Sequence, residues 1–395
     1  MNKRINLQSF KQFLASSTGG GIILFICVIL ALFMANSPWS EGLNSLFSTV
    51  VGFENESVQL SYSIKQWIDD GLMAIFFLLV GLEIKRELVE GELSSPRQAA
   101  LPIFAALGGA ILPALIYTAF NFNQPFSQHG WGIPMATDIA FALAVISMLG
   151  KKTPASLKIF LAALAIVDDL LAILVIAVFY SSDLHFTYLL YAGGIFILLL
   201  LFNRLGVKSL LAYIIPGLFI WYFIHHSGIH ATIAGVLVAM TLPTTVDDKE
   251  SPLEKLEHLL ARPVNFIIIP IFAFANTAIT LHSEMIGGLT STMGLGIIVG
   301  LIVGKSIGIL GTSWICVKSG LSKLPEGAGW KHLFGVGLLG GIGFTMSIFI
   351  SMLSFNDPIL VEEAKLAVLT GSLVSGLLGY LYLSGLAKKK EIRVQ

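Results

Sequence analysis

The chain has 395 residues, of which 55% are hydrophobic and 12% are charged, about half the charged share of an average soluble domain. With a mean hydropathy of +0.83, this composition leaves too little polar surface for a soluble globule and indicates an integral membrane protein in contact with lipid. The 24 basic and 24 acidic residues balance, so net charge does not point to a nucleic-acid partner, and none is expected. Cys27 and Cys316 lie in apolar runs that suggest neither a disulfide nor a metal site.

Apolar runs predict twelve transmembrane helices in an all-α polytopic protein. In chain order they lie at residues 18–36, 66–84, 98–120, 131–150, 156–180, 187–203, 208–224, 228–243, 263–281, 290–317, 330–355 and 362–386. The first run ends in "ANSPW", without an Ala-x-Ala cleavage pattern, so a retained first span is expected. The seventh and eighth runs are short for the roughly 20 residues that a spanning helix needs, and only "HHSGIH" separates them.

The distribution of basic residues supports this count. With the N-terminus assigned to the cytoplasm, all but three of the 24 Lys and Arg residues fall in inside segments. Lys65 and Lys365 are the two in outside segments, so the positive-inside rule predicts that both termini are cytoplasmic. The third is Lys305, in the middle of the tenth span, too far from a helix end to reach water.

The longest outer connection, residues 37–65, contains "FENESVQLSYS", which alternates with a period near two around a polar turn. This pattern fits a small extracellular β-hairpin. A solvated loop fits it equally well.

Four ionisable residues lie deep in the predicted spans: Asp138, Asp168, Asp169 and Lys305. Each such charge at the bilayer centre costs about 2.5–3.5 kcal/mol on insertion scales, so these residues are candidates for a functional site. A buried ion pair without a transport role is the alternative. Because neighbouring helix positions point about 100° apart, one aspartate of "LAIVDDLLAILV" can pair with Lys305 while the other faces a water-filled cavity.

Oxygen ligands at this depth favour protons or a hard cation over a transition metal. Two further segments add such ligands, "GIPMATDIAFAL" in the fourth span and "GGIGFTMSIFIS" in the eleventh. Helix-disfavouring residues interrupt both, and interrupted helices at matching positions indicate a transporter site. The interrupting residues and the threonines at matching positions are Pro134, Thr137, Gly341, Gly343 and Thr345.

Asp138 is expected to offset the positive N-terminal ends of these half-helices, and Thr137 to be a cation ligand. For Gly340 and Gly341, simple close packing of helices is the competing explanation.

Several motifs resemble the signature segments of the NhaA family of sodium/proton antiporters. They are "VGLEIKREL", "ATDIAFAL", "ALAIVDDLLAI", "IFAFANT", "LIVGKSIGI" and "GGIGFTMSIF", and the resemblance runs from about residue 19 to 382. It implies one transporter domain with twelve spans and two crossing, interrupted helices. The inverted-repeat core would cover about 98–180 and 290–386, and the remaining bundle about 18–84 and 187–281.

The resemblance also implies residue roles. Asp168 and Asp169 would bind Na⁺ or Li⁺ and exchange it for protons, with Thr137 beside them. Asp138 and Lys305 would balance the half-helix charges, and Lys305 would pair with Asp168.

The family places its pH sensor in a cytoplasmic funnel. The matching residues are Glu83, Arg86, Glu87, Glu257 and His258, which chemistry alone would describe as charged helix ends. Where the family carries a further His, this chain has Ala261. The family's dimers form partly through the outer hairpin, which implies a homodimer through residues 37–65.

The expected function is therefore electrogenic, pH-dependent export of Na⁺ or Li⁺ in exchange for protons across the bacterial inner membrane, without a cofactor or an enzymatic reaction. The nearest alternative is a sodium-coupled solute symporter, although the core offers few polar residues to bind a solute. An intramembrane aspartyl protease needs aspartates from two helices, and a Mg-diphosphate enzyme needs a third acid after "DDLLA". In a channel, opposite fixed charges at one site would trap the ion.

Overall fold

A computed structural model describes residues 7–55, 59–150, 153–181, 184–244 and 250–394. Its contacts divide the chain into two compact units. The first unit comprises Met1–Ile23, Glu92–Ala172 and His282–Gln395, and the second comprises Leu24–Gly91 and Ile173–Leu281. Each unit is therefore assembled from stretches that are far apart in sequence.

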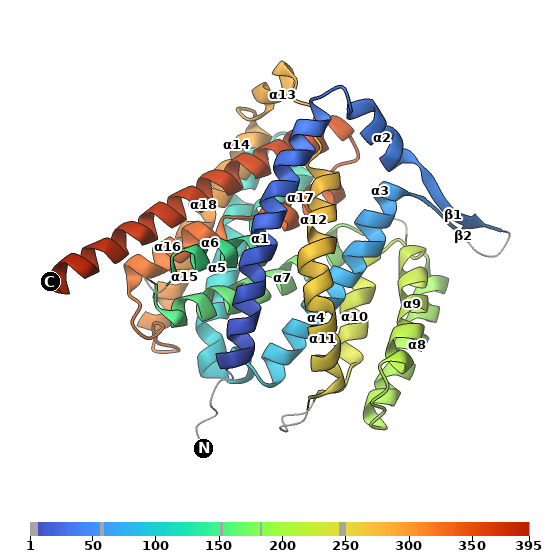
Figure 1. Ribbon diagram of the computed structural model, residues 1–395, viewed down its shortest axis with the longest axis horizontal. Coiled ribbons are helices and arrows are strands. Elements are labelled where there is room, and N and C mark those ends of the chain that lie inside the picture. Colours follow the sequence, from blue (N-terminus) through green and yellow to red (C-terminus); the bar gives the residue numbers. More distant parts are fainter. Residues whose placement is uncertain (1–6, 56–58, 151–152, 182–183, 245–249, 395) are drawn as a thin grey trace. The chain divides into compact units, whose positions relative to one another are not determined.

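The first unit consists of helices, two of which are interrupted (Figure 1). Its elements are α1 (Leu7–Ala35, up to Ile23), a 3₁₀ turn Glu92–Ser94, α5 (Pro96–Asn121), the 3₁₀ helix Gln128–Met135, α6 (Ile139–Met148), α7 (Ala155–Phe179, up to Ala172), α13 (Ser283–Gly288), α14 (Thr292–Val299), the π-helix Gly300–Gly304, α15 (Lys305–Lys318), α16 (Trp330–Gly340), α17 (Phe344–Ser354) and α18 (Pro358–Val394).

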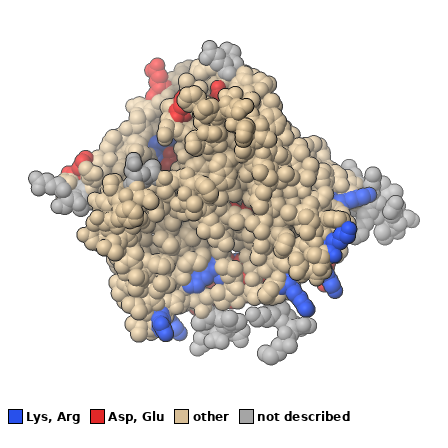
Figure 2. All heavy atoms as spheres, turned by 180° about the vertical axis from the view of Figure 1, so that it is seen from behind, with Lys and Arg blue, Asp and Glu red and all other residues tan. Residues whose placement is uncertain are grey.

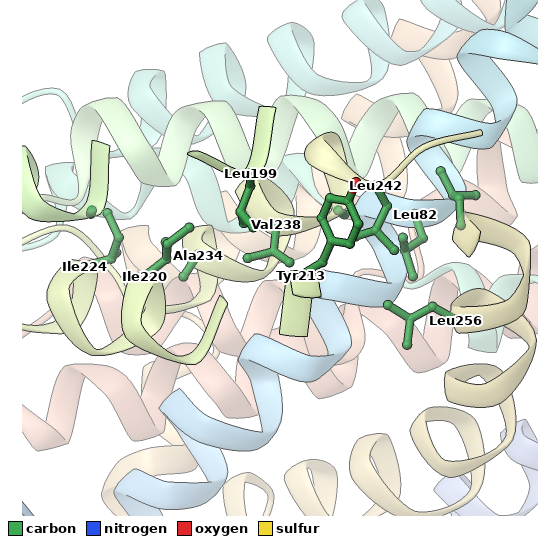
Figure 3. Packing of buried hydrophobic residues seen from close by; sticks show 12 residues of the cluster. Leu82, Leu199, Tyr213, Ile220, Ile224, Ala234, Val238, Leu242 and Leu256 are labelled. Carbon is green, nitrogen blue, oxygen red and sulfur yellow. The ribbon is translucent and has the colours of Figure 1, made fainter. Parts of the chain in front are cut away.

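The second unit holds the two strands and a separate set of helices. Its elements are α1 (Leu7–Ala35, from Leu24), α2 (Ser40–Ser48), β1 (Val50–Glu54), β2 (Gln59–Ser63), α3 (Ile64–Gln66), the π-helix Trp67–Leu72, α4 (Met73–Val89), α8 (Phe186–Arg204), α9 (Leu211–His225), α10 (Thr232–Thr241), α11 (Pro252–Pro263), the π-helix Val264–Ile268 and α12 (Ile269–Asn276). Buried side chains of α4, α8, α9, α10 and α11 point toward one another in its core, with Tyr213 and Val238 near the centre (Figure 3).

The apolar helices agree in part with the predicted spans. Among the described residues, seven helices are long and apolar enough to cross a membrane, or up to nine if each of two bent pairs is one span. Helices also form in the predicted spans 66–84, 208–224 and 228–243; α4 continues there from α3 and the π-helix Trp67–Leu72, whereas α9 and α10 have only 15 and 10 residues. A polytopic helical membrane protein is thus established, whereas the count of twelve stays a prediction.

The outer segment contains two short strands that pair antiparallel. The register runs from Val50 opposite Ser63 to Glu54 opposite Gln59, and both strands are drawn together in Figure 1. Residues 56–58, which connect them, lie outside the described residues. Every residue of β1 is exposed.

Uncharged side chains cover almost all of the face shown in Figure 2, where acidic and basic residues lie mainly toward the edges. Large apolar side chains such as Leu190, Leu218 and Leu381 are more than half exposed, at 74%, 63% and 63%. An apolar exterior of this extent is what a lipid-facing surface requires.

Two glycines allow α5 and α15 to approach each other closely. A Cβ on Gly308 would lie 2.1 Å from the carbonyl oxygen of Gly108, and a Cβ on Gly108 would lie 2.3 Å from the carbonyl oxygen of Gly308. The atoms nearest to a Cβ on Gly308 belong to the main chain of α5, so they cannot move aside as a flexible side chain could. Small residues at such crossings are typical of membrane helix pairs.

Gly308→Ala is therefore expected to destabilise the protein by about 1–3 kcal/mol, because the added methyl group forces α15 away from α5. The measurement is the thermal unfolding of the purified protein in detergent. Gly311→Ala is the matched control on the same helix, since no atom lies within 4 Å of its added Cβ. Equal unfolding temperatures for the two variants would contradict the close approach.

Candidate functional site

The fourth predicted span is interrupted, although not at Pro134 itself. Pro134 lies inside the 3₁₀ helix Gln128–Met135, and the break follows at residues 136–138. Ala136 and Asp138 are extended, with ψ angles of 150° and 101°. The helix resumes as α6 because the Asp138 carboxylate caps its first turn, accepting a hydrogen bond from the Phe141 N–H at 2.9 Å.

The eleventh predicted span is interrupted between α16 and α17, which differ in direction by 47°. Gly341 ends α16, and a Cβ there would lie 2.1 Å from the Leu301 carbonyl oxygen, so close packing requires this glycine. The strained conformation falls on Phe344, whose φ angle is +23°. Gly343, by contrast, has a φ of −83°.

The two breaks cross and bond to each other. The Asp138 N–H donates to the Ile342 carbonyl at 2.7 Å, and the Thr137 hydroxyl donates to the Gly340 carbonyl at 2.7 Å. The hydroxyl and the N–H of Thr345 both donate to Asp138 Oδ2. Backbone groups that each interrupted helix leaves unbonded are thus satisfied by the other.

Asp138 occupies the N-terminus of two helices at once. One carboxylate oxygen accepts from α6 and the other from α17, and the residue is 2% exposed. Helix N-termini carry a partial positive charge, so a single carboxylate offsets both.

Besides Asp138, the site contains a buried ion pair between Asp168 on α7 and Lys305 on α15. We call this pair, with Asp169 and Thr137, the acidic centre. Lys305 Nζ lies 2.6 Å from Asp168 Oδ2, and both side chains are completely buried. Lys305 is the first residue of α15 and follows directly on the π-helix Gly300–Gly304. Its alkyl chain lies over Gly109, where an added Cβ would be 3.6 Å from Lys305 Cδ.

Asp169 and Thr137 complete this centre. Thr137 is a direct neighbour of the Asp168 carboxylate, which links the ion pair to the crossing. Asp169 is within electrostatic range of Lys305 and only 2% exposed, so neither aspartate is open to water in this conformation. Within the described ranges, no three His, Cys, Asp or Glu side chains form a metal-binding group.

Comparison with known proteins shows the family to which the chain belongs. The family described as Na⁺/H⁺ antiporter 1 matches residues 11–383. The chain belongs to this family. The chain is 62% identical over 391 residues to the Na(+)/H(+) antiporter NhaA 2 of Flavobacterium johnsoniae, covering 99% of this chain and 96% of that protein. It is 47% identical over 389 residues to the Na(+)/H(+) antiporter NhaA 1 of Brucella anthropi, covering 96% of each.

A solved structure is also similar. The sodium proton antiporter MjNhaP1 from Methanocaldococcus jannaschii matches with a TM-score of 0.54 over 97% of this chain and 98% of that one. At 14% sequence identity this likeness concerns the fold alone. The resemblance drawn from the motifs is confirmed, and membership makes the chain a multi-pass transporter of an antiporter family.

The five pH-sensing candidates all lie in the second unit, and four of them cluster. The Arg86 guanidinium Nε contacts both Glu257 carboxylate oxygens at 3.1 and 2.9 Å, and another nitrogen lies 3.0 Å from Glu87. Glu83, 7% exposed, is within electrostatic range of these three residues. The arrangement joins α4 to α11 through one shared guanidinium.

The fifth candidate, His258, has a different partner. Its Nδ1 lies 3.0 Å from Glu250, and both side chains are about half exposed, at 60% and 49%. Although it adjoins Glu257 in sequence, it is bonded outside the Arg86 cluster.

Sequence reasoning did not single out Lys85, which counted only as a basic residue on the inner side. Its ammonium donates to the carbonyls of Met240 and Leu242 at 2.7 and 2.6 Å, at the C-terminal end of α10. Asn203 donates to the Thr241 carbonyl at 2.6 Å. Such capping of a helix end leaves no sequence signal when the partner is more than a hundred residues away.

The buried ion pair yields a prediction about stability. Asp168→Asn leaves the Lys305 ammonium without its contacting carboxylate, and the expected loss is about 3–5 kcal/mol. Combining it with Lys305→Gln should recover much of this loss, because no unpaired charge then remains. Thermal unfolding of the two single variants and the double variant in detergent measures this coupling. Additive effects would contradict the pairing.

Proposed function

We propose that this protein is an electrogenic Na⁺(Li⁺)/H⁺ antiporter of the bacterial cytoplasmic membrane, exporting the cation in exchange for protons. The observation that carries the proposal is the buried Asp168–Lys305 pair, in contact with the helix crossing through Thr137. Membership of an antiporter family and relatives named Na⁺/H⁺ antiporters support the same conclusion.

In the proposed exchange, protons and the cation compete for the same carboxylates. Asp168, Asp169 and Thr137 offer carboxylate and hydroxyl oxygens, which suit a small hard cation. Protons bind the same carboxylates, so a cation enters only after protons have left. When the cation binds Asp168 it takes the place of the Lys305 ammonium, which lies 2.6 Å away.

The charge balance of one cycle makes the exchange electrogenic. If two protons replace one monovalent cation, net charge crosses the membrane and the rate responds to membrane potential. The protons occupy two of the ionisable groups at the centre, either both aspartates or one aspartate and Lys305. Asp138 and Lys305 meanwhile balance the partial charges of the interrupted helices.

We also propose the finer topology that the family resemblance implies. Twelve spans would run from a cytoplasmic N-terminus to a cytoplasmic C-terminus, with a core of about 98–180 and 290–386 and a second bundle of about 18–84 and 187–281. The bias of Lys and Arg toward inside segments supports this orientation. A homodimer through residues 37–65 is supported by the exposure of every residue of β1, a strand at the edge of its sheet.

The sodium-coupled symporter, the alternative from the sequence, gains no support. The relatives reported above are named antiporters. Beside Asp168, the Lys305 ammonium already contacts one carboxylate oxygen, and the Thr137 hydroxyl is bonded to the Gly340 carbonyl.

Asp169→Asn should abolish exchange, because the neutral amide neither binds a cation strongly nor gives up a proton. Purified protein in liposomes with an acid interior reports exchange through a trapped pH-sensitive dye. Adding Na⁺ or Li⁺ outside should dissipate the gradient, and K⁺ should not. Undiminished exchange by Asp169→Asn would refute the assignment. Asp357→Asn, at the exposed start of α18, is the matched control and should exchange normally.

The Arg86 cluster is proposed to set the pH dependence. Glu257→Gln removes one of the carboxylates that share this guanidinium. With one negative charge fewer, the remaining carboxylates hold protons less tightly, so the rate profile should move to lower pH by about 1 unit. The same liposome assay across a series of pH values measures this shift. His258→Gln should move the profile less, since its bonded partner is the exposed Glu250 and it acts on Glu257 only electrostatically; equal shifts in both variants would reject the assignment.

A further inference from the structure

Ser372 and Ser375 lie one turn apart on α18 and face the break between α16 and α17. Both are buried, at 6% and 0% exposure. Neither residue belongs to the acidic centre. Their hydroxyl groups nevertheless bond the main chain on both sides of the break.

We infer that Ser372 and Ser375 are positioning residues for the cation site, because they hold the two broken ends of the interrupted helix in place. The inference rests on the proposed function, since it concerns the geometry of that site. Their role is indirect: the hydroxyls fix the backbone that in turn fixes Asp138 and Thr137.

At the end of α16, the carbonyls that lack helical partners are shared among several donors. The Ser375 hydroxyl donates to the Leu338 carbonyl at 2.7 Å. The N–H groups of Gly341 and Ile342 turn back to the carbonyls of residues 338 and 339, both at 3.1 Å. The remaining carbonyl, that of Gly340, accepts from Thr137. Ser375 thus adds a side-chain bond from α18 to this end.

At the start of α17, the first N–H groups are satisfied from two sides. The Phe344 N–H donates to Ser372 Oγ at 3.0 Å, and the next N–H, of Thr345, donates to Asp138 Oδ2 at 3.1 Å. Two successive amides therefore point to opposite neighbours, one on α18 and one in the crossing.

The conformation of Phe344 makes Ser372 more than an ordinary cap. A φ of +23° is unfavourable for a side chain of this size, and such a conformation persists only where its surroundings hold it. Ser372 Oγ accepts the hydrogen bond of the Phe344 N–H and so stabilises this conformation. If Phe344 relaxed to an ordinary helical φ, the Thr345 N–H would turn away from Asp138.

Ser375 also packs closely against the break. A Cβ on Gly341 would lie 2.2 Å from Ser375 Oγ, so the hydroxyl is in direct contact with the glycine of the break. The two serines consequently restrain the segment 341–344 from the side opposite the acidic residues. Losing either bond should loosen the crossing while leaving the helices intact.

The test compares Ser372→Ala, Ser375→Ala and Thr370→Val in the liposome exchange assay. Thr370 is the matched control, because it also lies on α18 and its hydroxyl donates only within its own helix, to Leu366. We expect each serine variant to raise the apparent KM for Na⁺ by about fivefold, as the loss of one buried hydrogen bond would, with a smaller change in kcat. A variant that merely folded less well would lose maximal rate at an unchanged KM.

A second measurement does not depend on transport. Hydrogen exchange, followed by mass spectrometry of the peptide covering residues 341–346 in detergent, should be faster in Ser372→Ala than in the wild type and Thr370→Val. Unchanged exchange of this peptide together with an unchanged KM would overturn the inference. Should Ser372→Ala fail to fold, Ser372→Cys keeps the shape of the side chain and should give the same effects in weaker form, because sulfur still accepts a hydrogen bond but poorly.

The two proposals fail in different ways. If the wild-type protein does not exchange Na⁺ for protons, the proposed function is wrong, while the peptide measurement still decides whether the serines hold the break. If the wild type exchanges and the serine variants match it in both KM and hydrogen exchange, only the positioning role is wrong.

Discussion

A charge or an unbonded backbone group inside a membrane has to be compensated by protein, because lipid supplies neither counter-charge nor hydrogen bonds. The crossing of the interrupted helices meets this requirement with few residues. Asp138 bonds the first turns of α6 and α17, and Thr137 bonds the end of α16. The Asp168–Lys305 pair compensates its own charges directly beside Thr137. The remainder of the first unit positions these two arrangements against each other.

Close helix approach is the means of that positioning. The helix α15, which begins with Lys305, lies against α5 without an intervening side chain at Gly108 and Gly308. The π-helix before Lys305 changes the phase of the helix at that residue, and such segments are frequent at functional sites. A bilayer gives helices no hydrophobic reason to associate, so contact of this kind has to supply the attraction.

The sequence predicted those residues of the candidate site that are unusual in a membrane span. Asp168, Asp169, Asp138 and Lys305 were found because charges in apolar runs are costly, and Thr137 and Thr345 because they adjoin helix-breaking residues. The exact break was not predictable: Pro134 is tolerated inside a 3₁₀ helix, and the positive φ falls on Phe344, not on a glycine. Ser372, Ser375 and Lys85 were missed because a serine in an apolar helix and a lysine at a helix end are ordinary, and their partners are set by tertiary structure. The same limit applies to the span count, since α9 and α10 are shorter than a bilayer normally requires.

The double role of Asp138 has a consequence for proton counting. A proton on this carboxylate would remove an acceptor from α6 or α17 and cancel the charge that both helices share. Protonation would therefore weaken the bonds of the crossing, which sets Asp138 apart from the carboxylates proposed to carry protons. Any substitution that removes the charge of Asp138 should accordingly act on both interrupted helices at once, although α6 and α17 lie far apart in sequence.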